Sequence, residues 1–233
     1  MNAVITGATK GMGKSIALKL AQAGYNLIIC SRNQAEIDLL SQELVIKHPA
    51  VSVSGLQTDC SNPLEVNQFC NFVQQHFQTV DVLINNVGTY IPASILDEDE
   101  HVLDLQMQIN FLAAYTFCKT FGKQMRDAQK GHIINICSIA AINPVVEAGS
   151  YTVTKAALLS LTKVLRLELM KHSVKVTAIL PGSTLTSSWE GTSIPAERFI
   201  AAEDVASSVL ACLSMSAGAN PDQLVITPLN GNL

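Results

Sequence analysis

The sequence predicts an α/β protein with a three-layer, doubly wound parallel sheet of about seven strands. Short apolar runs alternate with segments of helical length and periodicity along the whole chain. The runs are continuously apolar, which is typical of strands in a parallel sheet covered on both faces. Right-handed crossovers then put helices on both sides of the sheet. Because no Pro-, Gly- or Ser-rich linker divides this pattern, we expect a single domain over residues 1–233.

The apolar runs predict strands at residues 3–6, 26–30, 51–56, 80–85, 132–138, 175–180 and 223–226. Apolar residues at helical spacing predict helices that include residues 14–22, 34–47, 63–77 and 151–171. In sheets of this kind, ligands bind beyond the carboxyl ends of the strands, near the point where the strand order reverses. The candidate site residues are therefore those that follow each run.

The composition excludes several classes of function. The net charge is −4 and no basic run is present, so we expect no nucleic-acid partner. No segment approaches the roughly 18 consecutive apolar residues of a membrane span, so we expect no membrane partner. The six cysteines and five histidines are scattered without metal-ligand spacing. We therefore expect no metal site, and reduced cysteines in a cytoplasmic protein.

A glycine-rich turn, Thr6-Gly7-Ala8-Thr9-Lys10-Gly11-Met12-Gly13, joins the first strand to a helix. Glycines let the backbone turn tightly and approach a pyrophosphate, which the free N–H groups and dipole of the helix N-terminus attract. The spacing is Gly-x-x-x-Gly-x-Gly, not the commoner Gly-x-Gly-x-x-Gly. A tight connection without a ligand is the alternative interpretation.

The second strand is followed by Ser31 and Arg32, and no carboxylate occurs before Glu36. An acidic residue here would bind the ribose 2′-hydroxyl of NAD, whereas an arginine accommodates the 2′-phosphate of NADP. Lys10, inside the glycine turn, adds a second positive charge. A lone arginine is often only a solvated surface residue. Its coincidence with the missing acid favours NADP(H) over NAD(H).

Tyr151 and Lys155 are four residues apart on a predicted helix and so share a face. An ammonium near a phenol stabilises the phenolate, so the tyrosine can exchange a proton near neutral pH. This spacing is common by chance, and its significance comes from Ser138, at the end of the preceding strand. Asn135, on the same strand, is interpreted as structural.

Several motifs together resemble the short-chain dehydrogenase/reductase family, in order and at normal spacing. They are the glycine turn, Asn85-Asn86-Val87-Gly88, Asn110, Ser138, Tyr151-x-x-x-Lys155 and Pro181-Gly182. The resemblance covers nearly the whole chain and implies a Rossmann fold. Val87 departs from the family pattern, which usually has alanine there.

The resemblance implies a role for each of four catalytic residues. Tyr151 donates a proton to the substrate carbonyl oxygen, and Ser138 hydrogen-bonds the same oxygen. Lys155 supports the tyrosine and binds the nicotinamide ribose, while Asn110 holds a water that links Lys155 to solvent. By itself, a serine at a strand end or a buried asparagine is interpreted as structural. Because Ser138 and Asn110 occur together with Tyr151 and Lys155 at the family's spacing, we interpret them as site residues. The expected cofactor contacts are Gly7, Thr9, Lys10, Gly11, Met12, Gly13, Ser31, Arg32, Asp59, Cys60, Asn86, Gly88, Tyr151, Lys155, Pro181, Gly182, Thr184 and Thr186.

Substrate selection is expected in a lid at about residues 183–200. The lid contains Trp189, which closes over a substrate or packs against the body or a partner subunit; we favour packing. Val145 and Val146 are expected to line the opposite wall of a mostly apolar pocket. Glu147 is interpreted as solvated.

We expect an oxidoreductase that transfers hydride between NADP(H) and a small-molecule carbonyl or secondary alcohol, such as a small ketone or 3-oxo compound. The alternative is a 3-oxoacyl-acyl-carrier-protein reductase, which the overall pattern also resembles. Gln129 and His172, next to Lys130 and Lys171, stand where those enzymes carry arginines that dock the carrier protein. Residues 226–233 lack their Asp-Gly-Gly ending and resemble instead the tails of 3-hydroxy-acid dehydrogenases and small NADP-dependent carbonyl reductases in the same family. A second alternative is a non-catalytic NADP(H)-binding sensor or scaffold, which would not need the proton donor.

The predicted helix at 151–171 is apolar nearly all round, whereas a helix with one face in water is amphipathic. We therefore expect another subunit to cover its outer face, in a homodimer or homotetramer, as in the family.

Overall fold

The computed structural model describes residues 1–186, 189 and 191–233. Within them, the predicted architecture is confirmed: a seven-stranded, all-parallel sheet has the order β3-β2-β1-β4-β5-β6-β7. Its strands are β1 (Asn2–Thr6), β2 (Asn26–Ser31), β3 (Val53–Gln57), β4 (Val82–Asn85), β5 (Gly131–Ile136), β6 (Val174–Pro181) and β7 (Gln223–Ile226). The strand order reverses between β1 and β4, which is where a doubly wound sheet opens a crevice.

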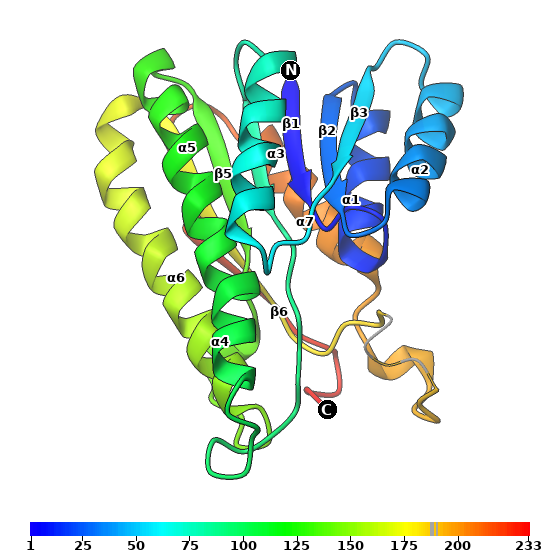
Figure 1. The fold of residues 1–233 in the computed structure, drawn as a ribbon, viewed down its shortest axis with the longest axis vertical. Helices are drawn as coiled ribbons and strands as arrows, with labels where there is room; N and C mark the ends of the chain where they lie inside the picture. Colours follow the sequence, from blue (N-terminus) through cyan, green and yellow to red (C-terminus); the bar gives the residue numbers. More distant parts are fainter. Residues whose placement is uncertain (187–188, 190) are drawn as a thin grey trace.

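Helices cover both faces of the sheet (Figure 1). They are α1 (Gly11–Gln22), α2 (Gln34–Lys47), α3 (Pro63–His76), α4 (Val102–Met107), α5 (Ala113–Ala128), α6 (Gly149–Leu169) and α7 (Ala202–Ser214). A π-helical turn, η1 (Gln108–Leu112), joins α4 to α5. Short 3-10 turns are η2 (Ile139–Ala141), η3 (Met170–His172) and η5 (Ala196–Arg198).

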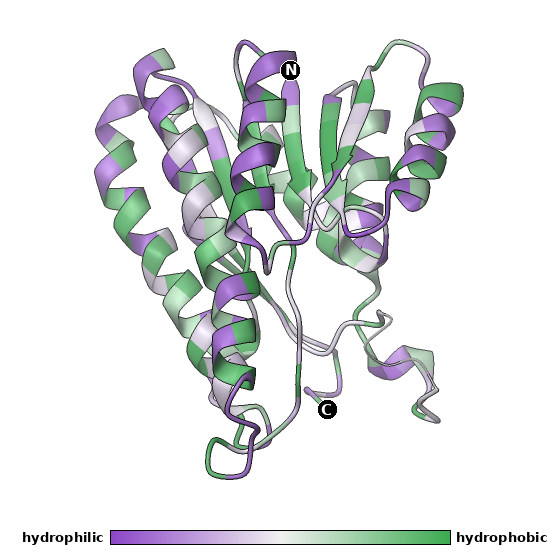
Figure 2. Cartoon of the chain, in the orientation of Figure 1, coloured by the Kyte–Doolittle hydropathy of each residue, from purple (hydrophilic) through white to green (hydrophobic). Residues whose placement is uncertain are grey.

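Two apolar layers hold the helices to the sheet. On one face, Ile16 of α1, Ile37 of α2 and Val205 of α7 pack in a cluster with strand residues such as Ile5 and Ile29. On the other face, α3, α5 and α6 bury a second cluster that includes Phe69, Phe117, Phe121 and Leu169. The strands are mostly apolar, although β3 is mixed and β5 contains polar residues, while the helices carry both apolar and polar residues (Figure 2). This pattern is the one that a sheet buried on both faces requires.

The loops after β1 and β4 are tied together at the switch point. Ile5 pairs with Ile84 in the parallel register, so the two strands end side by side. The Thr6 hydroxyl accepts the N–H groups of Asn86 and Val87, each at 3.1 Å. The Asn86 amide in turn donates to the Thr6 carbonyl at 3.0 Å. These hydrogen bonds therefore fix the loops after β1 and β4 against each other at the base of the crevice.

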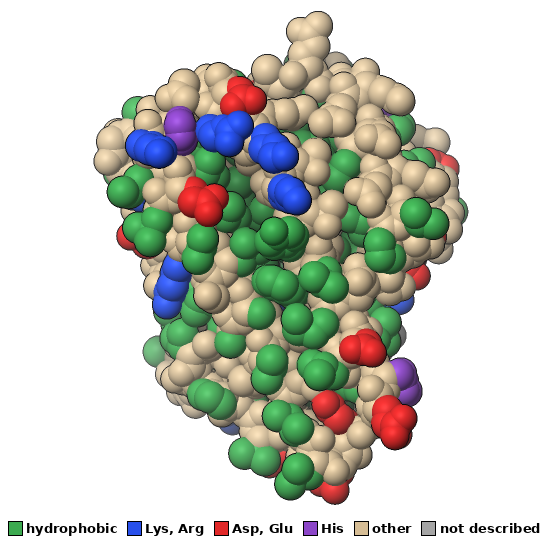
Figure 3. All heavy atoms as spheres, turned by 60° about the vertical axis from the view of Figure 1, so that its left-hand side comes forward, with side chains coloured by type: hydrophobic (Ala, Val, Ile, Leu, Met, Phe, Trp, Pro, Cys, Tyr) green, Lys and Arg blue, Asp and Glu red, His purple; other side chains and the backbone are tan. Residues whose placement is uncertain are grey.

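Helix α6 keeps an apolar outer face, as expected. Val153, Val164 and Leu167 are exposed on it. Figure 3 shows apolar side chains along this side of the molecule, with basic side chains gathered at its upper end. In the part of the chain that the structure describes, no helix is both long and apolar enough to cross a membrane.

Candidate active site

The glycine turn after β1 forms a cradle at the N-terminus of α1. Gly7 and Gly11 have φ angles of 65° and 50°, in the left-handed region that favours glycine. A Cβ on Gly13 would lie 2.0 Å from the Gly7 carbonyl oxygen, so only glycine permits this close packing. Helix α1 has neither a side-chain cap nor an acidic residue in its first turn. Its first N–H groups are therefore suited to an anion such as a pyrophosphate.

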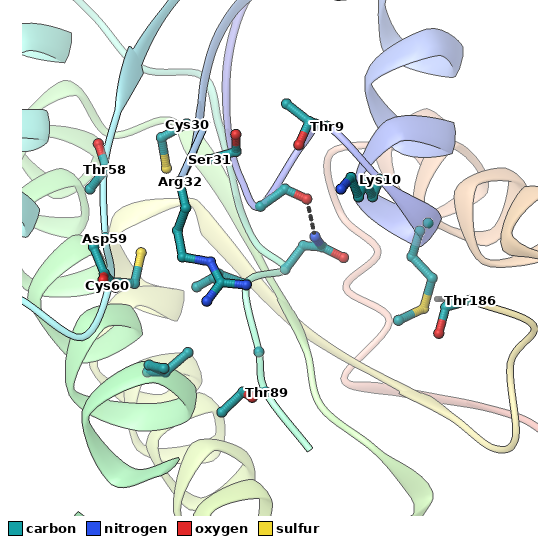
Figure 4. A pocket seen from close by; sticks show the side chains of 18 residues that line it. Thr9, Lys10, Cys30, Ser31, Arg32, Thr58, Asp59, Cys60, Thr89 and Thr186 are labelled. Atoms are coloured by element: carbon teal, nitrogen blue, oxygen red, sulfur yellow. Dashed lines mark hydrogen bonds between the residues drawn. The ribbon is translucent and has the colours of Figure 1, made fainter. Parts of the chain in front are cut away.

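A cavity of about 280 Å³ lies against this cradle (Figure 4). It gathers many of the predicted cofactor residues from five loops: Gly7, Thr9, Lys10, Gly11, Met12, Gly13, Ser31, Arg32, Asp59, Cys60, Asn86, Gly88 and Thr186. It is also lined by residues that the sequence analysis did not assign to the cofactor: Cys30, Thr58, Val87, Thr89 and Ile109. Cys30 is the last but one residue of β2 and Thr58 follows β3, so their position near strand ends was a usable signal. Ile109 lies in η1, and only the tertiary structure brings it here.

The cations of this cavity differ in their partners. The Lys10 ammonium lies 2.9 Å from a carboxylate oxygen of Glu36, and the Thr9 hydroxyl donates to the other oxygen at 2.9 Å. Lys10, Thr9 and the charge of Arg32 hold the pKa of Glu36 below its ordinary value. Among the described residues, Arg32 makes no ion pair. Its side chain points into the cavity (Figure 4).

Helix α6 carries the predicted tyrosine and lysine on one face. The Lys155 ammonium lies 5.7 Å from the centre of the Tyr151 ring. It is 3% exposed and donates to the Ile136 carbonyl at the end of β5, at 3.1 Å. A Cβ on Gly88, a residue of the cavity wall, would lie 3.3 Å from the same nitrogen. Lys155 therefore stands between the phenol ring and the edge of the cavity.

Ser138 lies beyond the end of β5, not within it. The strand was predicted to continue through residue 138, but it ends at Ile136. Ser138 instead begins the 3-10 turn η2, where its hydroxyl accepts the Ala140 N–H at 3.1 Å. Because this hydroxyl accepts from the backbone, its own proton is available to another acceptor.

Asn110 lies in the π-helical turn and is almost fully buried. Its amide donates to the Thr89 carbonyl at 2.9 Å and to the Thr154 hydroxyl at 3.1 Å. Its carbonyl oxygen accepts the Thr89 N–H at 2.7 Å. A Cβ on Gly88 would lie 3.4 Å from that oxygen. Asn110 therefore fixes the loop after β4 against α6, beside Lys155.

Tyr90 is a site residue that the sequence analysis missed. Its ring packs edge-on against Tyr151, with 5.1 Å between the ring centres, yet it is 46% exposed. Burial raises the pKa of Tyr90, and Tyr151 and Glu147 add to this effect. The only sequence signal was an aromatic residue two positions after Gly88.

The start of α6 is held by a loop distant in sequence. The helix has no side-chain cap and no acidic residue in its first turn. The Ser150 hydroxyl donates a short hydrogen bond to Glu98, which supplies the missing carboxylate. The Gly149 N–H donates to the Ala93 carbonyl at 3.0 Å. These contacts fix the turn of helix that carries Tyr151.

The remaining predicted residues lie outside the cavity wall. Gly182 and Thr184 follow β6, and the Thr184 hydroxyl donates to the Gly182 carbonyl at 3.0 Å. A Cβ on Gly182 would lie 2.0 Å from the Asn232 side-chain oxygen, so the C-terminal segment packs on this turn. Pro181 ends β6. The substrate candidates Val145 and Val146 are exposed.

Trp189 packs edge-on against Phe199, with ring centres 4.9 Å apart. Because Phe199 belongs to the same expected lid, packing against the body or a partner subunit stays a prediction. Residues 187, 188 and 190 of the expected lid lie outside the described part of the chain. Asn135, interpreted as structural, is fully buried and accepts from the Asn85 amide at 2.7 Å. All six cysteines are free and buried.

Known proteins resemble this chain over most of its length. The short chain dehydrogenase family model matches residues 1–194. An uncharacterized oxidoreductase of Staphylococcus epidermidis is 30% identical over 227 residues, which cover 97% of this chain and 96% of that protein.

Two solved structures share the fold. One is an alcohol dehydrogenase from the archaeon Thermococcus sibiricus complexed with 5-hydroxy-NADP: TM-score 0.92, 24% identity, covering 100% of this chain and 98% of that one. The other is L-sorbose reductase from Gluconobacter frateurii complexed with NADPH and L-sorbose: TM-score 0.89, 26% identity, covering 97% and 95%. Together with the match of the family model, the glycine cradle and the Tyr151–Lys155 helix, these similarities identify the chain as a member of the short-chain dehydrogenase/reductase family.

Proposed function

We propose that the protein is an NADP(H)-dependent reductase of small ketones or 3-oxo compounds, which interconverts a carbonyl and a secondary alcohol. The observation that carries this proposal is the position of Lys155. Its ammonium is 5.7 Å from the Tyr151 ring and close to Gly88, at the edge of the glycine-lined cavity. Lys155 thus lies between the tyrosine that would donate the proton and the cavity that would bind the nucleotide.

The chain's own residues account for the proton chemistry. When bound, NADP(H) supplies or accepts the hydride. The Tyr151 phenol donates its proton to the carbonyl oxygen, and Lys155 stabilises the phenolate that remains. The Ser138 hydroxyl, which accepts from the Ala140 N–H, donates to the same carbonyl oxygen. Asn110, fixed beside Lys155, holds the water that returns the proton.

Three features of the cavity support binding of a dinucleotide with a 2′-phosphate. The uncapped N-terminus of α1 suits the pyrophosphate. Arg32, which makes no ion pair within residues 1–186, 189 and 191–233, offers its guanidinium to a phosphate. No acidic residue occupies the end of β2, where NAD would need one. The L-sorbose reductase structure, which contains NADPH, supports the same preference.

The experiment that tests the reaction is a panel of ketones and acyl thioesters assayed with NADPH. We expect Tyr151→Phe to lower the turnover number by about 10³-fold. The affinity for NADPH should stay within about twofold, because the phenol is not part of the cavity wall. A Tyr151→Phe variant that reduced ketones normally would contradict the proposed mechanism.

A carrier-protein substrate is the runner-up. Where that class of enzyme carries arginines, Gln129 and His172 hydrogen-bond each other at 2.9 Å. An amide and an imidazole attract an acidic carrier less strongly than two guanidinium groups, which favours a small substrate. A sensor or scaffold is disfavoured, since a protein that only binds NADP(H) does not need the proton donor Tyr151. If the enzyme reduced only thioesters bound to a carrier protein and none of the small ketones, the carrier-protein substrate would become the preferred assignment.

We propose that residues 1–233 act as one nucleotide-binding domain, with a substrate lid at about 183–200. The free, buried cysteines suit the reducing cytoplasm.

We also propose a homodimer or homotetramer in which a second copy covers α5 and α6. A hollow of about 550 Å³ lies between these helices, with Val164 and Leu165 in its wall. Light scattering of the wild type and of Leu167→Glu tests this, because a buried charge would dissociate the subunits.

A further inference from the structure

Glu36 is a carboxylate next to the cations of the nucleotide cavity, and neither the sequence motifs nor the proposed reaction gives it a role. It lies in the first turn of α2, where the Asn33 side chain accepts its N–H at 3.3 Å and fixes its backbone. One carboxylate oxygen is 2.9 Å from the Lys10 ammonium. The other accepts the Thr9 hydroxyl at 2.9 Å. Thr9 and Lys10 both line the cavity.

The charge balance at this end of the cavity depends on Glu36. Two cations, Lys10 and Arg32, line the cavity. Lys10 is paired with Glu36, whereas Arg32 has no ion-pair partner in the described part of the chain. The pKa of Glu36 is lowered, chiefly by its hydrogen bond with Lys10, so the carboxylate is charged at neutral pH. A 2′-phosphate, with about −1.5 to −2 charges, therefore meets one cation that is free of an ion pair, Arg32, and one, Lys10, that is already paired with Glu36.

We propose that Glu36 sets how strongly the protein discriminates between NADP(H) and NAD(H), by competing with the 2′-phosphate for Lys10. Binding of the phosphate draws the Lys10 ammonium from the carboxylate, and the lost ion pair subtracts from the affinity for NADP(H). NAD(H) has no phosphate at this position and leaves the Lys10–Glu36 pair intact. This inference rests on the proposed function, in which this cavity binds NADP(H).

The test is Glu36→Gln, which removes the charge and keeps an amide oxygen to accept the Thr9 hydroxyl. Dissociation constants for NADPH and NADH are measured by titration calorimetry at low and high salt. We expect NADPH to bind about fivefold more tightly, because the lysine is released from its exposed ion pair. We expect the affinity for NADH to change by less than about twofold, and high salt to shrink the gain for NADPH.

Glu43→Gln is the matched control. Glu43 lies on the same helix and pairs with Lys14 and Lys47, at 3.5 Å and 2.7 Å, but it is not part of the cavity wall. We expect it to leave both dissociation constants unchanged. In a Lys10→Met background, Glu36→Gln should no longer improve NADPH binding, because the competition needs the lysine.

The outcomes separate this inference from the proposed function. If the wild type prefers NADPH but Glu36→Gln leaves its affinity unchanged, the inference is wrong. A weaker affinity would also overturn it, because Glu36 would then hold Lys10 ready for the phosphate instead of competing with it. If the wild type binds NADH as tightly as NADPH, the proposed cofactor preference itself fails.

Discussion

The Lys155 ammonium faces the Tyr151 ring at 5.7 Å and, within the described residues, has no carboxylate partner. It is 3% exposed, and the Ile136 carbonyl accepts one of its protons at 3.1 Å. A buried ammonium without a counter-ion acts on nearby groups that can become negative. The Tyr151 phenol lies one helical turn away, and the Cys137 thiol, whose pKa burial raises to about 11, is a second neighbour on which the charge of Lys155 acts.

Lys155→Met keeps the length of the side chain and removes its charge. We expect the turnover number for carbonyl reduction to fall by about 10²- to 10³-fold, because the phenolate loses its stabilising charge. Steady-state kinetics with NADPH and a reactive ketone measure this. Lys163→Met, an exposed position on the same helix, is the control and should retain activity. Equal losses in both variants would mean that the helix, not the charge, was damaged.

Arg32→Asp reverses the charge that faces the cavity. We expect the dissociation constant of NADPH to rise by about tenfold or more, because the 2′-phosphate loses the Arg32 guanidinium and meets a carboxylate. NADH should bind as well as before or better, since an acid at this position can accept its 2′-hydroxyl. Fluorescence titration with both cofactors measures the ratio. Arg126→Asp, at the far end of α5, serves as the control; an unchanged ratio in Arg32→Asp would rule out the phosphate contact.

Glu98→Gln tests the support for the first turn of α6. The amide still accepts the Ser150 hydroxyl, but the negative charge near the helix N-terminus is lost. We expect the free energy of unfolding to fall by about 0.5–1 kcal/mol, the usual size of a charge–dipole interaction at a helix end. Urea denaturation measures it, with Glu100→Gln, exposed in the same loop, as the control. A loss of equal size in the control would show that the effect is not specific to the contact with Ser150.

His132 predicts a pH dependence of stability. It lies in β5, 5% exposed, with Nε2 2.7 Å from the Thr177 hydroxyl. Burial, with a smaller contribution from Lys175, lowers its pKa from 6.5 to about 4. Between pH 6.5 and pH 4, the His132 imidazole is protonated in the unfolded chain but stays neutral in the folded chain. Stability is therefore complete above pH 6.5 and decreases by about 3 kcal/mol toward pH 4.

The comparison of denaturation curves at pH 7 and pH 4.5 measures this loss. His132→Gln should flatten the dependence, whereas His101→Gln, at an exposed position, should leave it as it is. A wild-type slope that persists in His132→Gln would assign the acid sensitivity to another group.

The local sequence pattern predicted the sheet and the glycine turn of the nucleotide cavity. The apolar runs foretold the strands to within a few residues, because burial on both faces of a parallel sheet leaves a continuous signal. Ser138 shows the limit: the apolar run continues past Ile136, but the ladder to β6 ends at that residue. The end of a strand depends on where the neighbouring strand stops pairing with it. The sequence of the strand itself does not contain this information.

The sequence by itself determined the fold class, the glycine cradle and the spacing of Tyr151 and Lys155, since each depends on residues adjacent in the chain. The tertiary structure alone decided that Glu36 meets Lys10, that Tyr90 packs on Tyr151 and that Asn110 is tied to Thr89. These pairs come from loops and helices that meet only when the sheet is assembled. Their contacts depend on strand order and register, which no local periodicity encodes.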